Sequence, residues 1–184
     1  IGFQERVVLL FPPSLDFFVA FVGCVKAGVI AVPVPPPIPD KLATDVPHFC
    51  AIVEDCGSSV VLTHSKYYWA VIFARFVPGR KSWSWPKVTW HNIDKINPSP
   101  KEFQQWSSLR DIAFLQYTSG STGQPKGVIV PHGVLRAQVL LILRHNNFSD
   151  TVTLSWLPHF HDMGLIGCFL APLFAGASGH YFSP

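Results

Sequence analysis

The stretch that most constrains the fold is a strand, a helix and a second strand in close succession near the start of the chain. Residues 6–11 are a short apolar run stopped by two prolines, which predicts a buried strand. Apolar residues at three- and four-residue spacing over 17–25 predict a largely buried helix, and Gly28 suits its end. Residues 29–34 are a second apolar run. This unit implies a mostly parallel sheet flanked by helices.

The rest of the chain repeats this alternation. Helices are predicted over residues 48–55, 67–76, 132–145 and 162–175, and strands over residues 60–63, 111–117, 128–130 and 152–157, with a further short strand over 88–93. The remainder of residues 77–105 shows no clear period. The predicted fold class is therefore α/β, with one or more mostly parallel sheets flanked by helices.

A loop rich in glycine and hydroxyl residues follows the predicted strand over 111–117. Residues 118–127 read TSGSTGQPKG and carry three glycines, four hydroxyls and one lysine. Glycines let the backbone approach a ligand closely, because no Cβ stands in the way. Backbone N–H groups and hydroxyls can bind phosphate oxygens, and a lysine adds a mobile positive charge. The loop has the chemistry of a polyphosphate cradle, and a plain surface turn is the alternative.

The spacing of the glycines excludes two common phosphate motifs. Gly120, Gly123 and Gly127 lie three and four residues apart, and Lys126 is followed by a glycine. The P-loop requires G-x-x-x-x-G-K-[ST], and the dinucleotide fingerprint requires G-x-G-x-x-G. The loop fits neither pattern.

A second turn, LPHFHDMG over residues 157–164, leads from a predicted strand into a predicted helix. In open α/β sheets the ligand crevice lies outside the carboxyl ends of the strands. We therefore expect His161 and Asp162 to follow a strand that neighbours the loop strand and to share its cleft. A helix cap with a satisfied histidine is the alternative for an isolated His-Asp pair.

Composition and charge exclude several classes of function. A net charge of +3 is too small and scattered to indicate nucleic acid. The longest apolar stretches, over 17–34 and 163–177, are interrupted by Lys26 and Pro172 and fall short of the roughly 20 residues of a membrane span. Four cysteines without C-x-x-C or metal spacing fit a reducing, cytoplasmic compartment. A charged fraction of 14%, against about 25% in typical domains, favours a part of a larger protein.

Three stretches resemble one family. Residues 118–127 resemble the phosphate-loop signature of the adenylate-forming superfamily, which activates carboxylic acids with ATP. The string W-L-P-x-x-H-D-M-G-L-I-G over 156–167 is similar to a signature of its fatty acyl-AMP ligase branch, and residues 6–37 also resemble that branch. The resemblance runs across most of residues 5–184.

The resemblance implies a role for each matching residue. The residues that would bind the β- and γ-phosphates of ATP are Thr118, Ser119, Gly120, Ser121, Thr122, Gly123, Lys126 and Gly127. His161 would gate the passage between the nucleotide and acid pockets, and it is predicted with Lys126 to be catalytic. The residues expected on the substrate side are His161, Asp162, Met163 and Gly164.

The resemblance also implies the reaction and its partners. A fatty acid would attack ATP to give acyl-adenylate and pyrophosphate, with Mg²⁺ bridging phosphate oxygens. The full-length enzyme would then load an acyl carrier protein. Residues 1–184 would be a partial N-terminal AMP-binding domain, truncated at both ends, without the C-terminal domain and inactive alone. An acyl-coenzyme A ligase and a non-catalytic binding module of this fold are the alternatives.

Overall fold

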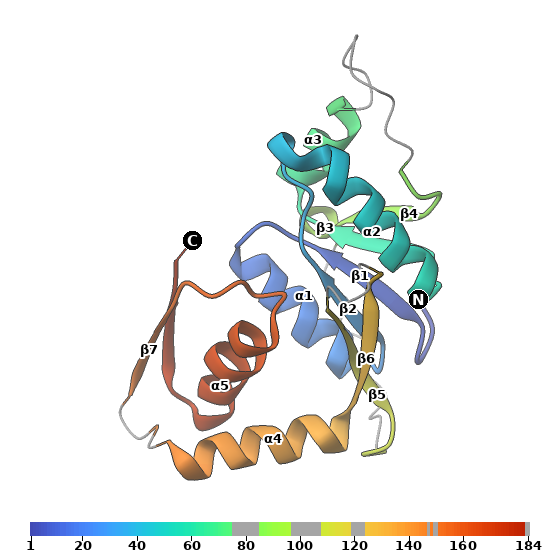
Figure 1. Ribbon diagram of the computed structural model, residues 1–184. Helices are drawn as coiled ribbons and strands as arrows, with labels where there is room; N and C mark the ends of the chain where they lie inside the picture. Colours follow the sequence, from blue (N-terminus) through green and yellow to red (C-terminus); the bar gives the residue numbers. More distant parts are fainter. Residues whose placement is uncertain (75–84, 97–107, 119–123, 147, 149–150, 183–184) are drawn as a thin grey trace.

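The main sheet of the protein is mostly parallel. The computed structural model describes residues 1–74, 85–96, 108–118, 124–146, 148 and 151–182. Within these residues the main sheet has the strand order β4-β3-β1-β2-β5-β6 (Figure 1). Its strands are β1 (Arg6–Leu10), β2 (Ile30–Val34), β3 (Val60–Thr63), β4 (Thr89–Asn92), β5 (Ile112–Thr118) and β6 (Lys126–Pro131). Only the β5–β6 pair among them is antiparallel, so the predicted fold class is confirmed.

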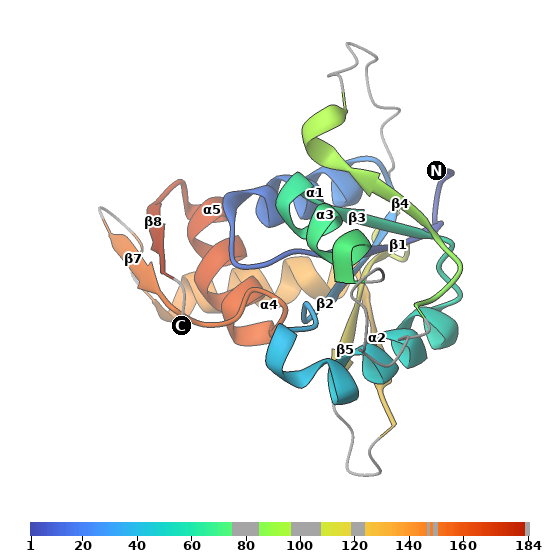
Figure 2. The ribbon, with the colours of Figure 1, turned by 90° about the horizontal axis from the view of Figure 1, so that it is seen from above.

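Helices cover both faces of this sheet. The helical segments are α1 (Leu15–Lys26), η1 (Pro39–Lys41), α2 (Leu42–Cys56), α3 (Ser65–Ala74), η2 (Ile93–Lys95), α4 (His132–His145), η3 (Met163–Leu170) and α5 (Ala171–Ala175). Figures 1 and 2 show α1 and α2 on opposite sides of β1 and β2. This arrangement gives two apolar cores, one on each face.

The alternation of side chains along β1 builds these two cores. Val7 and Leu9 point to the face covered by α1, α4 and η3, whereas Val8 and Leu10 point to the face covered by α2. All four side chains are fully buried. A strand buried on both faces needs apolar residues at every position, as the continuous run at 6–11 has.

Helix α2 begins earlier than the sequence predicts. The sequence predicts a start at residue 48, but α2 spans Leu42–Cys56 with Pro47 inside it. The proline lies in the second turn, where it removes one backbone donor without ending the helix. Helix α3 covers Ser65–Ala74, and the predicted end at residue 76 lies outside the described residues.

The predicted helix over 162–175 consists of two parts. Its first part, η3, is a π-helix, in which the N–H of Ala171 donates to Ile166 O, five residues earlier. Pro172 has no N–H and therefore cannot bond to the carbonyl of Cys168. The hydroxyl of Tyr181 donates to that carbonyl instead, at 3.0 Å. The prediction of a single regular α-helix is wrong in this first part.

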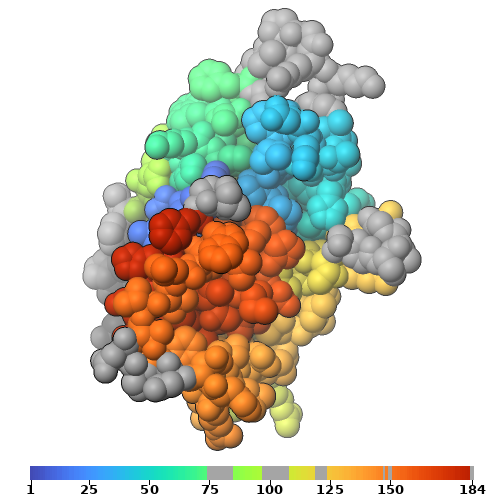
Figure 3. Space-filling model, turned by 60° about the vertical axis from the view of Figure 1, so that its left-hand side comes forward, coloured from blue at the N-terminus to red at the C-terminus, as the bar shows by residue number. Residues whose placement is uncertain are grey.

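A second, smaller sheet lies beside these helices. It pairs β7 (Val152–Ser155) with β8 (Ser178–Tyr181) in parallel. Leu165 and Leu170 of η3 belong to the same core as α1, so the C-terminal segments pack against the main sheet layer. Figure 3 shows these orange and red segments as one mass below the cyan and green part of the chain. In the described part of the chain, no helix has the length and hydropathy that a membrane span requires.

Candidate functional site

The strands that flank the predicted phosphate loop form the antiparallel edge pair of the main sheet. Thr118, the last residue of β5, lies opposite Lys126, the first residue of β6, and both are exposed. Residues 119–123 lie outside the described residues. Of the predicted cradle, the structure therefore places Thr118, Lys126 and Gly127, all at the carboxyl end of β5.

Gly127 lies against the ring of Tyr117. A Cβ atom on Gly127 would be 2.9 Å from Cζ of Tyr117, which is too close for a side chain. The phenol is 8% exposed, and its hydroxyl donates a hydrogen bond to the carboxylate of Asp55 on α2. A side chain at position 127 would therefore displace the buried Tyr117 ring.

The predicted His161 turn is attached to the main sheet by its neighbour His159. The Nε2 atom of His159 lies 3.0 Å from the carbonyl oxygen of Phe11, just after β1. A carbonyl only accepts hydrogen bonds, so Nε2 carries the proton. Burial lowers the pKa of His159 to about 4, although the bond to Phe11 opposes the shift. His159 is therefore a neutral, structural histidine.

A second attachment joins this turn to the strand that leads into the phosphate loop. Nε2 of Gln116 on β5 donates to the carbonyl oxygen of Phe160 at 2.7 Å. Gln116 lies two residues before Thr118, and Phe160 directly precedes His161. The Gln116 side chain is 8% exposed, and its Oε1 has no hydrogen-bond partner among the described residues. The two predicted turns therefore adjoin each other.

The route by which they meet differs from the expected one. The sequence predicted that both turns follow neighbouring strands of one sheet, but β7 pairs with β8 outside the main sheet. That part of the prediction is wrong. Two hydrogen bonds hold the turn at the carboxyl edge of the main sheet. His159 of the turn bonds to the backbone just after β1, and Gln116 of β5 donates to the backbone of the turn.

His161, Asp162 and Met163 are exposed where the turn passes into η3. The carboxylate of Asp162 accepts a hydrogen bond from the N–H of Met163 at 2.7 Å, so it caps the helix. Gly164 is buried, and a Cβ there would lie 2.3 Å from the carbonyl oxygen of Pro158. The turn can close only with glycine at this position.

An apolar cavity of about 350 Å³ adjoins Asp162 and Met163. One wall is η3, and the other comes from α4 and the end of β6. The lining residues are Val130, Val134, Leu135, Gln138, Ile142, Asp162, Met163, Ile166 and Gly167. Apart from Gln138 and Asp162 the lining is apolar, which suits a hydrocarbon chain.

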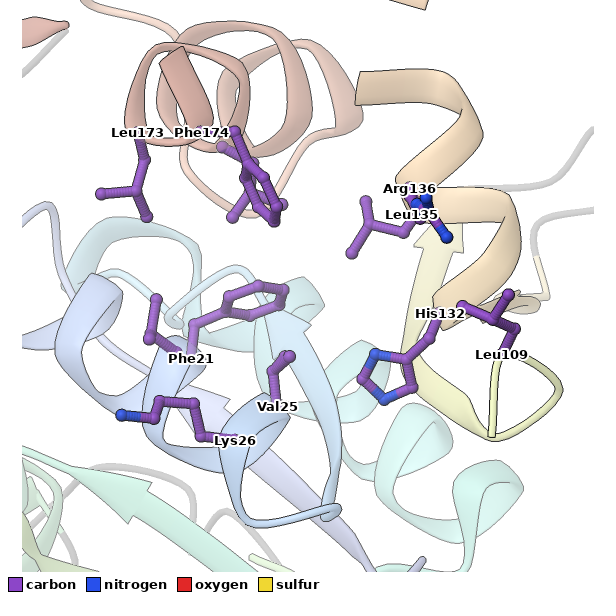
Figure 4. Close-up of a pocket in the computed structure, with 11 residues that line it drawn as sticks. Phe21, Val25, Lys26, Leu109, His132, Leu135, Arg136, Leu173 and Phe174 are labelled. Carbon is purple, nitrogen blue, oxygen red and sulfur yellow. The ribbon is translucent and has the colours of Figure 1, made fainter. Parts of the chain in front are cut away.

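A larger cavity of about 470 Å³ lies between α1, α4 and α5 (Figure 4). Phe21, Val25 and Phe174 line it, with Arg136 and the buried His132 at one side. Size alone favours this cavity as a binding site. Of the predicted site residues that the structure describes, however, none lines it. We assign the candidate site to the smaller cavity, which adjoins the attached turn.

Two supporting residues, Gln116 and His159, were absent from the predicted site. Gln116 is a polar residue within an otherwise apolar buried strand, and this departure from the pattern was the available signal. His159 stood beside the more conspicuous pair His161 and Asp162. Its burial follows from contact with Phe11, 148 residues away, so no local pattern could indicate it.

Comparison with known proteins gives one consistent family. Residues 1–184 match the family described as AMP-binding enzyme. The chain is 36% identical over 184 residues to the medium-chain-fatty-acid–[acyl-carrier-protein] ligase JamA of Moorena producens, covering 98% of this chain and 31% of JamA. It is 35% identical over 188 residues to the long-chain-fatty-acid–AMP ligase FadD23 of Mycobacterium tuberculosis, with 98% and 31% covered. The chain thus spans about a third of the length of the curated relatives it matches.

Solved structures agree with this result. A fatty acyl-adenylate ligase from L. pneumophila, in complex with acyl adenylate and pyrophosphate, matches all of this chain with a TM-score of 0.80 and 37% identity. The match covers 31% of that ligase. The adenylation domain of a keto acid-selecting NRPS module has a TM-score of 0.84 at 18% identity, so it shows the shared fold alone.

Proposed function

This chain belongs to the AMP-binding enzyme family, and we propose that it is a partial N-terminal AMP-binding domain of a longer ligase that activates a fatty acid with ATP. Its curated relatives are named as fatty-acid ligases and are about three times as long. The observation that carries the proposal is the hydrogen bond from Gln116 to Phe160, because it joins the turn of His161 to the strand of the phosphate loop.

In the proposed reaction the fatty acid carboxylate attacks the α-phosphate of ATP, and acyl-adenylate and pyrophosphate form. Both reactants are anionic, so catalysis rests on positioning and on neutralising charge rather than on a protein nucleophile. The loop over 118–123 would bind the β- and γ-phosphates with its hydroxyl and N–H groups. Lys126, exposed beside Thr118, would add a positive charge at the end of that loop.

The acid would bind on the other side of the turn. His161 would lie between the nucleotide and the acid, and the hydrocarbon chain would enter the cavity between η3 and α4, past Asp162 and Met163. Each methylene buried in such a cavity contributes about 0.8 kcal/mol. An apolar wall formed by two helices therefore favours a fatty acid over a small polar acid.

We propose that ATP would bind together with Mg²⁺, which would supply positive charge to offset that of the phosphates. In the described segments, no three His, Cys, Asp or Glu side chains form a group that could hold a metal ion. We therefore assign no residue to the cation. The proposed acceptor is the phosphopantetheine thiol of an acyl carrier protein. The proposed location is the cytoplasm, where the cysteine thiols, which form no disulfide in the described residues, would stay reduced.

The test is ATP–pyrophosphate exchange in the full-length protein. We expect exchange that depends on added fatty acid, and none from residues 1–184 alone. Lys126→Ala should weaken ATP binding by at least about tenfold, because it removes a phosphate-facing charge. Lys41→Ala, at an exposed lysine of η1, is the matched control. Equal ATP affinity and equal turnover in both variants would remove Lys126 from the mechanism.

The same assay separates the alternatives. Loading of an acyl carrier protein without formation of acyl-coenzyme A supports the proposed acceptor, and the reverse supports a coenzyme A ligase. If the protein binds ATP but shows no ATP–pyrophosphate exchange with any added acid, it is a non-catalytic module.

A further inference from the structure

Tyr117 lies on β5, directly before Thr118 and the phosphate loop. Its side chain points to the face opposite that of Gln116, toward α2. There its hydroxyl donates to Asp55, in the last turn of α2. Burial, followed by this bond to Asp55, raises the pKa of the phenol, so the hydroxyl stays protonated as a donor.

The other side of the Tyr117 ring touches the strand that leaves the loop. Tyr117 and Gly127 are directly opposite each other in the β5–β6 pair. An added Cβ on Gly127 would lie 2.9 Å from Cζ and 3.0 Å from the hydroxyl oxygen of Tyr117. The backbone of β6 therefore lies against the ring, with no space between them.

We propose that Asp55, Tyr117 and Gly127 form a clamp that fixes the two ends of the phosphate loop relative to α2, with Tyr117 as a positioning residue for ATP. This inference rests on the proposed function. Asp55 fixes the ring, and the ring fixes β6 through Gly127. The adjacent pair in the register is Thr118 with Lys126, which are the two ends of the loop.

The clamp gives β6, the edge strand that follows the loop, a second attachment to the protein. An edge strand has neighbours on one side only, so β6 depends on β5 for its ladder of hydrogen bonds. The phenol adds a side-chain contact at the point where that ladder ends. Loss of the hydroxyl bond would let the ring and β6 shift together and would move Lys126 away from the phosphates.

The experiment compares hydroxyl deletions at two tyrosines of the full-length protein. Tyr117→Phe should raise the Kd for ATP on the order of tenfold, because one hydrogen bond to a charged group is lost at the loop. Tyr67→Phe is the control, since that hydroxyl donates to Pro37 O at 2.8 Å and is not next to the loop. Asp55→Ala should match Tyr117→Phe, whereas Asp55→Asn keeps an acceptor oxygen and should retain most of the affinity.

A second measurement keeps the clamp testable apart from the reaction. We expect hydrogen exchange of the β6 amides to be faster in Tyr117→Phe than in Tyr67→Phe. If the wild type binds ATP and Tyr117→Phe binds it equally well, the clamp is overturned and the proposed function stands. If the wild type neither binds ATP nor exchanges pyrophosphate, the proposed function fails. In that case amide exchange still tests the clamp, and equal exchange rates of the β6 amides in Tyr117→Phe and Tyr67→Phe would overturn it.

Discussion

The two segments that carry the proposed chemistry are fixed to the protein in different ways. The phosphate loop runs between β5 and β6, whose backbones pair in an unbroken antiparallel register from Phe114 and Val130 to Thr118 and Lys126. The His161 turn follows β7, which lies outside the main sheet. No ladder joins β7 to β5 among the described residues, and the turn is instead attached by His159 and Gln116.

The two segments are therefore held in place by different kinds of contact. For the loop, the backbone pairing of β5 with β6 positions the exposed end residues Thr118 and Lys126, and the proposed Tyr117 clamp adds one side-chain contact beside them. For the turn, the exposed residues His161 and Asp162 depend on buried neighbours with specific contacts. Substitutions at these buried neighbours should therefore disturb the turn far more than their distance from any ligand suggests.

Gly164→Ala should give the largest effect on the turn. The new Cβ would lie 2.3 Å from the carbonyl oxygen of Pro158, and backbone cannot yield as a flexible side chain can. We expect a loss of about 3 kcal/mol in the free energy of unfolding, measured by urea denaturation.

Gly167→Ala in the same helix is the matched control. Its Cβ would meet only the sulfur of Met163, at 3.4 Å, and this side chain can move. We expect a change below about 1 kcal/mol. Similar losses in the two variants would show that tight closure of the turn is not what requires glycine at position 164.

His159 should make the stability of the protein depend on pH. Burial lowers its pKa from 6.5 to about 4, so the unfolded chain binds a proton between these values that the folded chain does not. Stability therefore falls as pH drops below about 6.5, and the loss levels off below about 4. Between pH 7 and pH 5 we expect this residue to account for about 2 kcal/mol.

His159→Phe isolates this contribution. The ring can stay against Phe17, whose centroid lies 4.2 Å from that of His159, but it cannot titrate. The variant should lose the bond to Phe11 at every pH and show a flatter unfolding profile between pH 7 and pH 5. Burial also lowers the pKa of His132, so a residual slope of the same sign should remain. An unchanged slope would refute the assignment to His159.

Much of the fold could be predicted because its signals are local. The run at 6–11 is apolar at every position, and a strand buried on both faces requires this pattern. Helix α4 has the predicted bounds, His132–His145. The start of α2 was missed because the effect of Pro47 depends on its place within the helix. The π-helix η3 was missed because its apolar run fits the spacing of an α-helix equally well.

The candidate site also has a part that local patterns could predict and a part that they could not. The motifs indicated the exposed residues Lys126, His161 and Asp162, whose chemistry can be inferred from residue type and spacing. They could not indicate the hydrogen bond between Gln116 and Phe160, which joins residues 44 positions apart. Contacts of this kind depend on the folded chain, so sequence patterns identified the chemical groups but not their supports.

Gln116→Leu should detach the turn from β5 while keeping the strand apolar. The carbonyl of Phe160 loses its donor, although removal of Oε1, which has no partner among the described residues, offsets part of the cost. We expect a loss of about 1.5 kcal/mol on urea unfolding. In the full-length protein the KM for the fatty acid should rise more than the KM for ATP, because the turn moves and the loop ladder does not. Equal rises in both would contradict the separate support of the two segments.

Tyr181→Phe should give the smallest effect, about 1 kcal/mol, because the ring still packs on Phe18 and only the hydroxyl bond to Cys168 is lost. The informative comparison is with Pro172→Ala, which restores an N–H four residues after Cys168. In that background the carbonyl has a backbone donor within reach, and Tyr181→Phe should cost less than it does alone. The two substitutions should therefore be non-additive in a double-mutant cycle on unfolding free energy. Strict additivity would mean that Tyr181 does not substitute for the donor that proline lacks.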